Sequence, residues 1–357
     1  MKNLDFRSDT LTMPSGKMRA CMAQADVGDD YYREDPTIRA VEDFAADLLG
    51  KEAALFVLSG TMGNLVSVRA QVSPGSAAIV SNSSHIYLNE TGHLASVCGL
   101  TSHPMPTPNG RYEITDLEAL LPVSQPGDPV SVLAPSLRLL CLENTHNGEG
   151  GRVIPVEYIA RLREFTSARN MILHMDGARV FNASIALACA PADLASHVDS
   201  VTFCLSKGLG APGGAIVAAN RDVVEEARRW RQMVGGGMRQ AGVLAAAGLL
   251  ALKENIQDLA TDHDNAKILA RGLRDTGLGV DVASVETNIV MAYVPEAFGS
   301  PTNFHHEMRN AGVLTLPPKG NRIRFVTHRD LSSADITLGL ERVSKLTKMF
   351  KKGKVDA

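Results

Sequence analysis

The sequence predicts an α/β protein with a mainly parallel central sheet in a large domain and a smaller α+β domain at the C-terminus. Three observations support this prediction. Short apolar runs recur through the first 220 residues, segments with helical periodicity separate these runs, and the pattern changes after about residue 250. Alternation of strands and helices is typical of a parallel sheet covered by helices on both sides.

Six runs are expected to be strands. Each is almost continuously apolar, as are strands that are buried on both faces of a parallel sheet. The six runs are AALFVL (53–58), SAAIVS (76–81), LRLLCLEN (137–144), MILHMD (171–176), SVTFCLS (200–206) and GAIVAA (214–219).

One helix is expected before the first of these runs and another between the third and the fourth. Residues 37–50, TIRAVEDFAADLLG, place four apolar residues on one helical face and end at Gly50, and glycine is common just past a helix end. These four residues are Ile38, Val41, Phe44 and Leu48. Residues 155–170 begin with a proline, which is frequent in the first turn of a helix.

The pattern after residue 250 predicts a compact α+β unit. Helices are expected over 253–277, near 303–311 and over 334–351, and strands are expected over 288–294 and 322–328. We therefore expect a large domain over residues 1–250, with the N-terminal segment included, and a small domain over 251–357.

Composition excludes several classes of function. The formal net charge of -3 gives no long-range attraction to nucleic acid or to anionic membranes. No apolar run reaches the roughly 18–20 residues that span a bilayer, and the charged start lacks the apolar stretch of a secretory signal. Five scattered cysteines without CxxC spacing indicate reduced thiols, not disulfides or a zinc site. We expect a soluble, cytoplasmic enzyme without a metal site.

Polar residues at strand ends are informative, because ligands of open α/β sheets bind beyond the carboxyl ends of the strands. Ser59, Gly60 and Thr61 follow the first run and open a helical segment. The free N–H groups at a helix start suit a phosphate. Small polar residues also cap helices that bind no ligand, so a plain helix cap is the alternative.

Two further strand ends carry candidate groups. Asp176 ends an apolar run with Arg179 close behind it, and a buried carboxylate needs a cation or an N–H group as its partner. A structural Asp–Arg pair is the alternative. His85 follows another strand end, where Glu90 could orient its ring, although scaffold histidines are more common. Two other histidines, His93 and His103, have no comparable surroundings.

Lys207 completes the set. Lysine is seldom buried, yet Lys207 stands where an apolar run meets the glycine-rich turn 208–214. An amine in such a place can react as a nucleophile with an aldehyde. A phosphate site, a strand-end aspartate and a reactive lysine together predict a pocket for pyridoxal 5′-phosphate (PLP). The lysine would bind the aldehyde, and the aspartate would keep the pyridine nitrogen protonated.

The chain resembles the low-specificity L-threonine aldolases over nearly its whole length. The matching motifs are FRSDTLT, VGDDYYREDPT, GKEAALFVLSGTMGN, CLENTHNG, HMDGARVFNA, CLSKGLGAP, VGGGMRQAG, DHDNAK, TNIV and RIRFVTH. The resemblance implies a PLP-dependent lyase of fold type I, the aspartate aminotransferase-like fold. Such an enzyme reversibly cleaves threonine, allo-threonine and related β-hydroxy-α-amino acids to glycine and an aldehyde.

The resemblance also implies roles for individual residues. Lys207 would bind PLP as a Schiff base, Asp176 would pair with the pyridinium nitrogen, and His85 would stack on the ring near the substrate hydroxyl. Residues expected at the phosphate are Gly60, Thr61 and, from a neighbouring subunit, Arg239.

The substrate carboxylate would be bound by Ser8, Arg179 and Arg324, with Arg179 also close to the cofactor. Planar guanidinium groups match a carboxylate well. Arg322 lies two residues away on the same strand face and is the alternative to Arg324, which fits the family's R-x-V-T-H pattern.

Three positions depart from the family pattern. Arg33 stands where relatives commonly carry glycine, so it would either add a charge to the pocket entrance or face solvent. Gln232 replaces a lysine of the RWRKM segment. Leu133 replaces a histidine that bacterial relatives often have before CLEN, so stereochemical preference does not follow from the resemblance.

Other functions are weighed against this one. β-Elimination or transamination on the same fold would also use Lys207 and Asp176. A nucleotide- or NAD-binding protein would need GxGxxG after its first strand or a GxxxxGK[ST] loop, which are lacking. A non-catalytic protein would not need to retain the PLP positions. The resemblance further implies a homo-oligomer, at least a dimer with shared active sites and commonly a tetramer.

Overall fold

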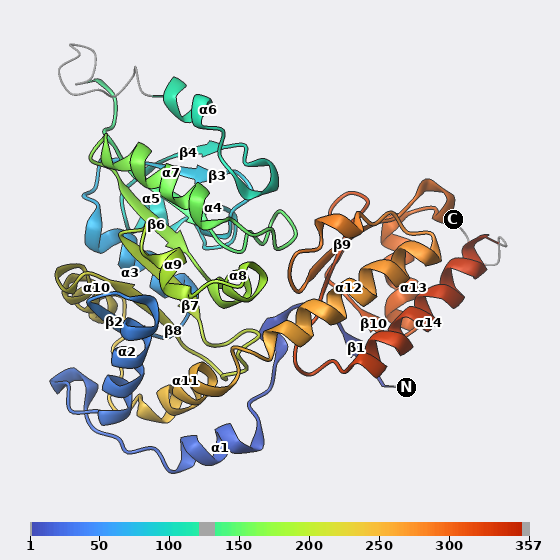
Figure 1. Ribbon diagram of the computed structural model, residues 1–357, viewed down its shortest axis with the longest axis horizontal. Coiled ribbons are helices and arrows are strands. Elements are labelled where there is room, and N and C mark those ends of the chain that lie inside the picture. Colours follow the sequence, from blue (N-terminus) through green and yellow to red (C-terminus); the bar gives the residue numbers. More distant parts are fainter. Residues whose placement is uncertain (1, 121–132, 352–357) are drawn as a thin grey trace. The chain divides into compact units, whose positions relative to one another are not determined.

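The computed structural model describes residues 2–120 and 133–351 and divides by internal contacts into two units (Figure 1). The large unit comprises segments 14–149 and 153–256, and the small unit comprises segments 1–13, 150–152 and 257–357. This grouping differs from the expected domain division at the N-terminus. The first 13 residues belong to the small unit, because β1 (Leu4–Asp5) pairs in parallel with β10 (Val313–Leu314).

A seven-stranded sheet forms the centre of the large unit, in the order β2-β8-β7-β6-β5-β3-β4. Strand β8 runs antiparallel to both of its neighbours, and the other pairs are parallel. The strands are β2 (Ala53–Val57), β3 (Ala77–Ser81), β4 (Thr101–Met105), β5 (Leu137–Glu143), β6 (Ile172–Asp176), β7 (Ser200–Cys204) and β8 (Ala215–Ala219). The mainly parallel sheet and all six expected strands are thereby confirmed.

Strand β4 was not expected from the sequence. Its residues, TSHPM, are mostly polar and include a proline, which cannot donate a ladder hydrogen bond. The strand lies at the edge of the sheet, where one side needs no partner. Proline and polar side chains are common on such edges.

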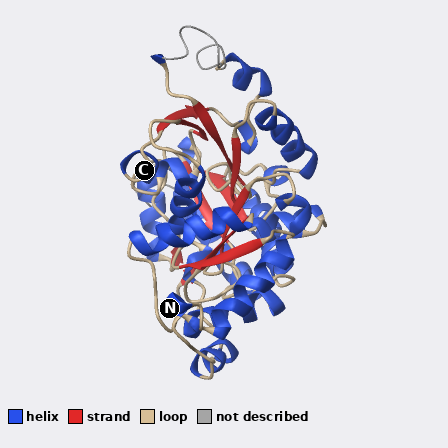
Figure 2. Ribbon diagram, turned by 90° about the vertical axis from the view of Figure 1, so that its left-hand side faces the viewer, coloured by secondary structure: helices blue, strands red, loops and turns tan. Residues whose placement is uncertain are grey.

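Helices cover both faces of this sheet (Figures 1 and 2). Helices α3 (Gly60–Gln71) and α10 (Arg221–Met233) pack against each other and against β2 and β8. Helix α9 (Pro191–Ala195) packs against both α2 (Pro36–Leu49) and α7 (Val156–Ser167). Helix α2 also contacts β2, and helix α7 contacts β6. The remaining helices of this unit are α1 (Gly16–Ala23), α4 (His85–Leu88), α5 (His93–Ser96), α6 (Ile114–Ala119), α8 (Val180–Leu187) and α11 (Gly242–Glu254).

Helix α2 shows where periodicity was accurate and where it was not. The helix ends before Gly50, as expected. Two of the four expected core residues are buried, but Phe44 and Leu48 are only half-buried. The buried stripe is shifted by one residue, to Ala45 and Leu49, because the helix packs on two sides, against β2 and against α11.

The small unit has its own core. Strand β9 (Ile289–Tyr293) pairs antiparallel with β11 (Arg322–Val326), and three helices accompany them: α12 (Leu259–Thr276), α13 (Pro301–Asn310) and α14 (Ser333–Lys351). The rings of Phe6 and Phe325 meet edge to face at 5.8 Å inside this core. The five expected elements are present, although the first helix begins at Leu259 instead of 253.

Two expectations from composition can be compared with the structure. All five cysteines are free thiols, and three of them are buried. Among the residues that the structure describes, no helix is both long and apolar enough to cross a membrane.

Candidate functional site

Five parallel strands end at one edge of the central sheet, and each is followed or closed by a polar residue. The strands are β2, β3, β5, β6 and β7, which run in the same direction. Their ends carry Ser59, His85, Glu143, Asp176 and Lys207. The sheet therefore brings the three predicted groups His85, Asp176 and Lys207 to the same edge, as ligand sites in this class of sheet require.

Asp176 is the last residue of β6 and is buried. Its Oδ1 accepts a hydrogen bond from the Ala178 N–H at 3.1 Å, and its Oδ2 accepts one from the Asn64 Nδ2 at 3.0 Å. Arg179 donates to the Asn147 Oδ1 at 3.3 Å. Both Asp176 oxygens accept from neutral N–H groups, and a structural Asp–Arg pair stays the alternative to a cofactor role.

The pKa of Asp176 is raised to about 6. Burial is the main cause, and the charges of Glu143 and Glu90 add to it. The charges of Lys207 and His85 act in the opposite direction. A positive charge next to Asp176 would therefore lower this pKa and favour the ionised carboxylate.

The buried carboxylate of Glu90 links two histidines, His85 and His93. The His85 Nδ1 lies 2.7 Å from the Glu90 Oε1, and the Glu90 Oε2 lies 2.7 Å from the His93 Nε2. Asn64 also donates to the Glu90 Oε1, at 2.9 Å. The expected orienting contact between Glu90 and His85 is confirmed, whereas the view that His93 has no comparable surroundings is wrong.

These contacts shift two pKa values. Burial opposes ionisation of Glu90, but the hydrogen bonds from His85 and His93 outweigh it and lower the Glu90 pKa to about 2. The hydrogen bond to Glu90 raises the pKa of His85. A neutral His85 keeps its proton on Nδ1 to meet the Glu90 carboxylate, which leaves Nε2 as a proton acceptor.

Glu143, the last residue of β5, accepts hydrogen bonds from two other segments of the chain. Its carboxylate accepts the backbone N–H of His85 at 2.6 Å and that of Asn147 at 2.8 Å. Asn147 in turn accepts a hydrogen bond from Arg179. The Glu143 carboxylate therefore positions the start of α4 at His85 and also Asn147, the partner of Arg179. Sequence reasoning missed Glu143, although the signal was present as a charged residue at the end of an apolar strand.

The start of α3 lies beyond the end of β2. The Ser59 Oγ accepts from the Met62 N–H at 3.2 Å, so the helix-cap alternative is correct for Ser59. Gly60 and Thr61 supply first-turn N–H groups, which have no partner within a helix. A Cβ on Gly60 would lie 2.7 Å from the Cys204 Sγ, so only glycine lets this turn approach β7 so closely. Their binding of a phosphate stays a prediction.

Lys207 is half-buried in the turn after β7, which closes with a hydrogen bond from the Gly210 N–H to the Lys207 carbonyl at 2.8 Å. Its charge acts on both Asp176 and His85. The Lys207 amine therefore belongs to the same group of interacting charges as Asp176 and His85.

Distance alone would also allow a metal ion among His85, Glu90 and Asp176, whose ligand atoms lie within 4.8 Å of one another. The amide of Asn64 argues against that use. It directs N–H groups at both carboxylates, and an N–H dipole pointing into the cluster disfavours a cation there.

The small unit contains the other expected substrate ligands. The Ser8 Oγ accepts from the Thr10 N–H at 3.2 Å and caps a short turn. Arg324 donates to the Arg7 carbonyl at 3.2 Å, and Arg322 lies on the same face of β11. Both arginines are half-buried, so the choice between them and the role of Ser8 stay predictions.

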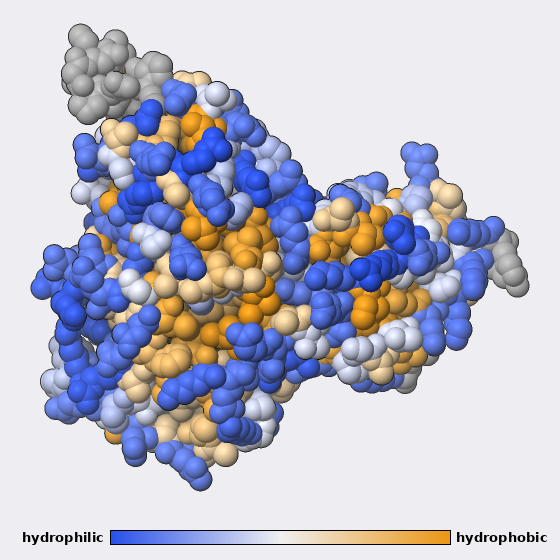
Figure 3. Space-filling model, in the orientation of Figure 1, coloured by the Kyte–Doolittle hydropathy of each residue, from blue (hydrophilic) through white to orange (hydrophobic). Residues whose placement is uncertain are grey.

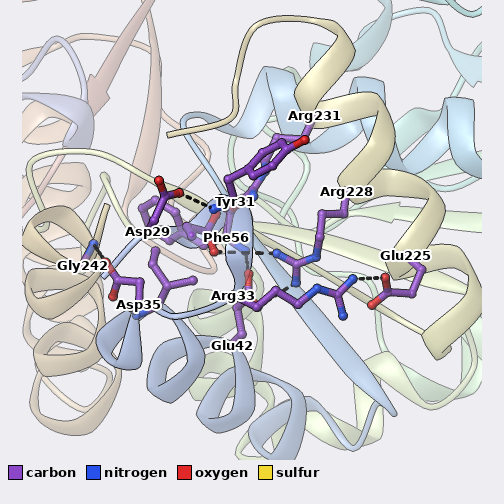
Figure 4. Close-up of polar contacts among 12 residues, drawn as sticks. Asp29, Tyr31, Arg33, Asp35, Glu42, Phe56, Glu225, Arg228, Arg231 and Gly242 are labelled. Atoms are coloured by element: carbon purple, nitrogen blue, oxygen red, sulfur yellow. Dashed lines mark hydrogen bonds and ion pairs between the residues drawn. The ribbon is translucent and has the colours of Figure 1, made fainter. Parts of the chain in front are cut away.

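Two of the three departures from the family pattern lie close together in the large unit. Arg33 forms an ion pair with Glu225 on α10, as Figure 4 shows. Arg33 and Gln232 both line a cavity of about 400 Å³. Residue 33 has a backbone φ of 60°, a left-handed conformation that glycine adopts at less cost. This conformation explains why glycine suits the position, and the exposed Arg33 side chain pairs with Glu225.

Arg239 and Leu133 lie on the surface of this chain. The Arg239 Nη1 is 3.3 Å from the Asp29 Oδ2, and its guanidinium lies 4.9 Å from the centre of the Tyr31 ring. Its expected contact with a neighbouring subunit's phosphate stays a prediction. Leu133 is 81% exposed.

Comparison with known proteins shows the family of the chain. The family described as beta-eliminating lyase matches residues 5–297. The chain is 42% identical over 340 residues to low-specificity L-threonine aldolase 1 of Arabidopsis thaliana, covering 94% of each protein. It is 43% identical over 329 residues to the low specificity L-threonine aldolase of Escherichia coli K12, covering 92% of this chain and 95% of the relative.

Solved structures share the fold. The threonine aldolase of Leishmania major superimposes with a TM-score of 0.82 at 21% identity, covering 96% of this chain and 99% of that one. A serine palmitoyltransferase of Sphingomonas wittichii superimposes with a TM-score of 0.75 at 16% identity, covering 98% of this chain and 88% of that one. The expected fold class is therefore confirmed.

Proposed function

The chain belongs to the beta-eliminating lyase family, together with the low-specificity L-threonine aldolases, and we propose on this basis that it is a carbon–carbon lyase. Its substrates would be threonine, allo-threonine and related β-hydroxy-α-amino acids, and its products glycine and an aldehyde. Relatives that carry the name threonine aldolase match more than nine-tenths of the chain. The observation that supports this function best is the buried Asp176 carboxylate at the sheet edge, which accepts N–H groups on both oxygens next to the strand that Lys207 follows.

The residues at the sheet edge fit PLP as the cofactor. Asp176 is a buried carboxylate with N–H donors on both oxygens, and Lys207 follows the neighbouring strand. Gly60 and Thr61 place first-turn N–H groups of α3 at the end of β2, where no partner within the helix is available to them. When bound, PLP supplies an electron sink for the negative charge that bond cleavage leaves on the substrate. Lys207 would hold its aldehyde carbon, Asp176 its ring N–H, and the amides of Gly60 and Thr61 its phosphate.

His85 is the proposed general base. Its Nδ1 is bound to Glu90, which leaves Nε2 to take the proton of the substrate β-hydroxyl as the aldehyde departs. General-base assistance contributes typically about 10²–10⁴-fold to a rate. Glu90 orients the ring and, by raising the His85 pKa, makes it a stronger base.

The substrate carboxylate would be bound by Arg179, which is buried at the start of α8 and aligned by Asn147. Arg324 and Ser8 are proposed as further ligands on the resemblance alone. A bidentate guanidinium–carboxylate pair would fix the direction of the bond to be broken.

We also propose a homo-oligomer, a dimer with shared sites or a tetramer, in the cytoplasm. Large apolar side chains are exposed on the large unit, and Figure 3 shows apolar residues over a broad part of its visible face. Examples are Tyr31, Tyr32, Leu88 and Met233. Exposed apolar surface of this kind is typical of protein–protein contacts.

The test is a product assay on purified protein with PLP and L-threonine. We expect acetaldehyde and glycine in equal amounts, and near-complete loss of turnover in Lys207→Ala. Lys253→Ala, a change at the end of α11, is the matched control and should keep the wild-type rate. Ammonia and a keto acid as products would favour β-elimination instead. A Lys207→Ala protein with wild-type turnover would overturn the assignment.

A further inference from the structure

Beneath the sheet edge, one buried amide touches both carboxylates of the site. Asn64 lies on α3 and is 1% exposed. Its Nδ2 donates to the Asp176 Oδ2 at 3.0 Å and to the Glu90 Oε1 at 2.9 Å. Two carboxylates from distant parts of the chain thus share the two N–H groups of a single amide nitrogen.

A second buried residue decides which way this amide faces. The His174 Nε2 lies 3.1 Å from the Asn64 Oδ1, and its Nδ1 lies 2.8 Å from the Ser200 Oγ. The Ser200 Oγ already accepts a hydrogen bond from the Gln71 Nε2 at 2.7 Å, so its own O–H is free to donate to the His174 Nδ1.

The tautomer of His174 follows from these contacts. Burial lowers the His174 pKa to about 4, so the ring is neutral at pH 7 and carries one proton. The Asn64 Nδ2 donates to two carboxylates, so the Asn64 Oδ1 faces His174 and must accept from it. The single ring proton is therefore on Nε2, and Nδ1 accepts from the Ser200 hydroxyl. The oxygen of the amide is therefore held by the histidine, and its nitrogen is left facing the carboxylates.

We propose that Asn64 is a positioning residue of the cofactor site: its amide joins Asp176 to Glu90, and His174 fixes the direction in which that amide faces. The inference rests on the proposed function, because it assigns a purpose to the Asp176 carboxylate. It goes beyond that function by naming two residues, Asn64 and His174, that touch neither substrate nor reacting atoms.

The consequence concerns the charge on Asp176. The charges of Glu143, Glu90, Lys207 and His85 act on this carboxylate. The two acids disfavour its ionised form, and the Asn64 N–H is one of the donors that offsets them. Without that donor, Asp176 would hold its proton to higher pH and would pair less well with a ring N–H of the cofactor. Hydrogen bonds to charged groups are strong enough to change an affinity by about 10- to 100-fold.

The first variant is Asn64→Leu, which removes the donor while keeping a side chain of similar length. We expect its dissociation constant for PLP, measured by absorbance after removal and re-addition of the cofactor, to rise by about 10- to 100-fold. We expect the acidic limb of kcat/KM against pH to move to higher pH by about one unit. A folded variant with wild-type values of both would overturn the proposal.

A matched pair at His174 covers the case in which Asn64→Leu does not fold. His174→Gln carries an amide N–H at the position of Nε2 and can still donate to Asn64. His174→Asn carries its amide at the position of Nδ1 and can reach only the serine. We expect weaker PLP binding in His174→Asn by about tenfold, with His174→Gln within about threefold of wild type.

Equal PLP affinities in these two folded variants would overturn the role of His174. Failure of the proposed function would be visible separately. In that case the wild-type protein itself would neither bind PLP nor release an aldehyde from threonine, whereas failure of this inference would leave wild-type behaviour intact and change only the comparison among the variants.

Discussion

The two units of this protein each bury a pair of acidic residues, and the pairs hold their protons differently. In the large unit, Glu90 has its pKa lowered to about 2 although Asp176 lies across one amide from it. In the small unit, burial and the charge of Asp9 raise the pKa of Asp262 to about 7. Burial disfavours the ionised form in both pairs, but at Glu90 the hydrogen bonds from His85 and His93 outweigh it.

The donors can be named. Glu90 receives hydrogen bonds from His85, His93 and Asn64, which outweigh the cost of burial. Asp262 faces the charges of Asp258 and Asp330 as well as Asp9, with Arg329 acting against them. The comparison indicates that histidine and amide donors, placed inside a protein, allow two carboxylates to lie close together with one of them fully ionised.

The largest effect is expected at His85, which donates a hydrogen bond to Glu90 and is also the proposed general base. His85→Asn keeps an amide N–H close to the position of Nδ1, so Glu90 keeps its partner, but the variant has no group to accept a proton. We expect kcat to fall by about 10²–10⁴-fold while PLP remains bound. Steady-state kinetics and the absorption spectrum measure both, with His103→Asn on β4 as the control. Unchanged kcat in the His85 variant would exclude it as the base.

The pair in the small unit predicts a dependence of stability on pH. The pKa of Asp262 is raised above its unfolded value. Between about pH 4 and 7 the folded protein therefore keeps a proton on Asp262 that the unfolded chain has already lost. The free energy of unfolding should therefore fall as pH rises through this window, with a limiting slope of about 1.4 kcal/mol per pH unit from this group.

Asp262→Asn should remove that decline, which urea unfolding at pH 5 and pH 7.5 would measure. The control is Asp264→Asn on the same helix, because Asp264 is exposed and its ion pair with Lys267 is long, at 3.7 Å. If Asp262→Asn and the wild type lose stability equally between the two pH values, the contrast between the two acidic pairs is wrong.

A smaller effect is expected from Glu90→Gln. The hydrogen bond to Glu90 is the main cause of the raised His85 pKa, so the substitution should lower that pKa. His85 would then lose its proton at lower pH, and the acidic limb of kcat/KM should move to lower pH, by up to about one unit. Asn64→Leu is expected to move the same limb in the opposite direction. A shift to higher pH in Glu90→Gln would contradict the assigned role of Glu90.

The smallest effect is expected outside both pairs, at Arg33. Its ion pair with Glu225 is exposed and adds at most about 1 kcal/mol, while its left-handed backbone costs about 1–2 kcal/mol relative to glycine. We expect Arg33→Gly to stabilise the protein by up to about 1 kcal/mol and leave kcat/KM within about threefold. Gly50→Ala, at the same φ of +60°, should destabilise it by about 1 kcal/mol. Urea unfolding compares the two, and loss of activity in Arg33→Gly would place Arg33 in the site.

Much of the site was predictable because its residues stand at strand ends. Asp176, Lys207 and His85 each follow an apolar run, and parallel strands bring such ends together. Asn64 and His174 could not be found in this way. Asn64 reads as an ordinary polar helix residue, and His174 lies inside an apolar run where nothing in the local sequence names its partners.

Sequence by itself therefore determined six of the seven strands of the central sheet, the chain direction at the sheet edge and most of the types of group that meet there, because apolar periodicity and strand ends are local properties. Tertiary structure decided which of those groups touch. The helix that carries Asn64 approaches β7 so closely that a Cβ on Gly63 would lie 2.4 Å from the Thr202 Cγ2. Hydrogen bonds and charge interactions change within a few ångströms, and such distances depend on how a helix packs on a sheet, which no local pattern encodes.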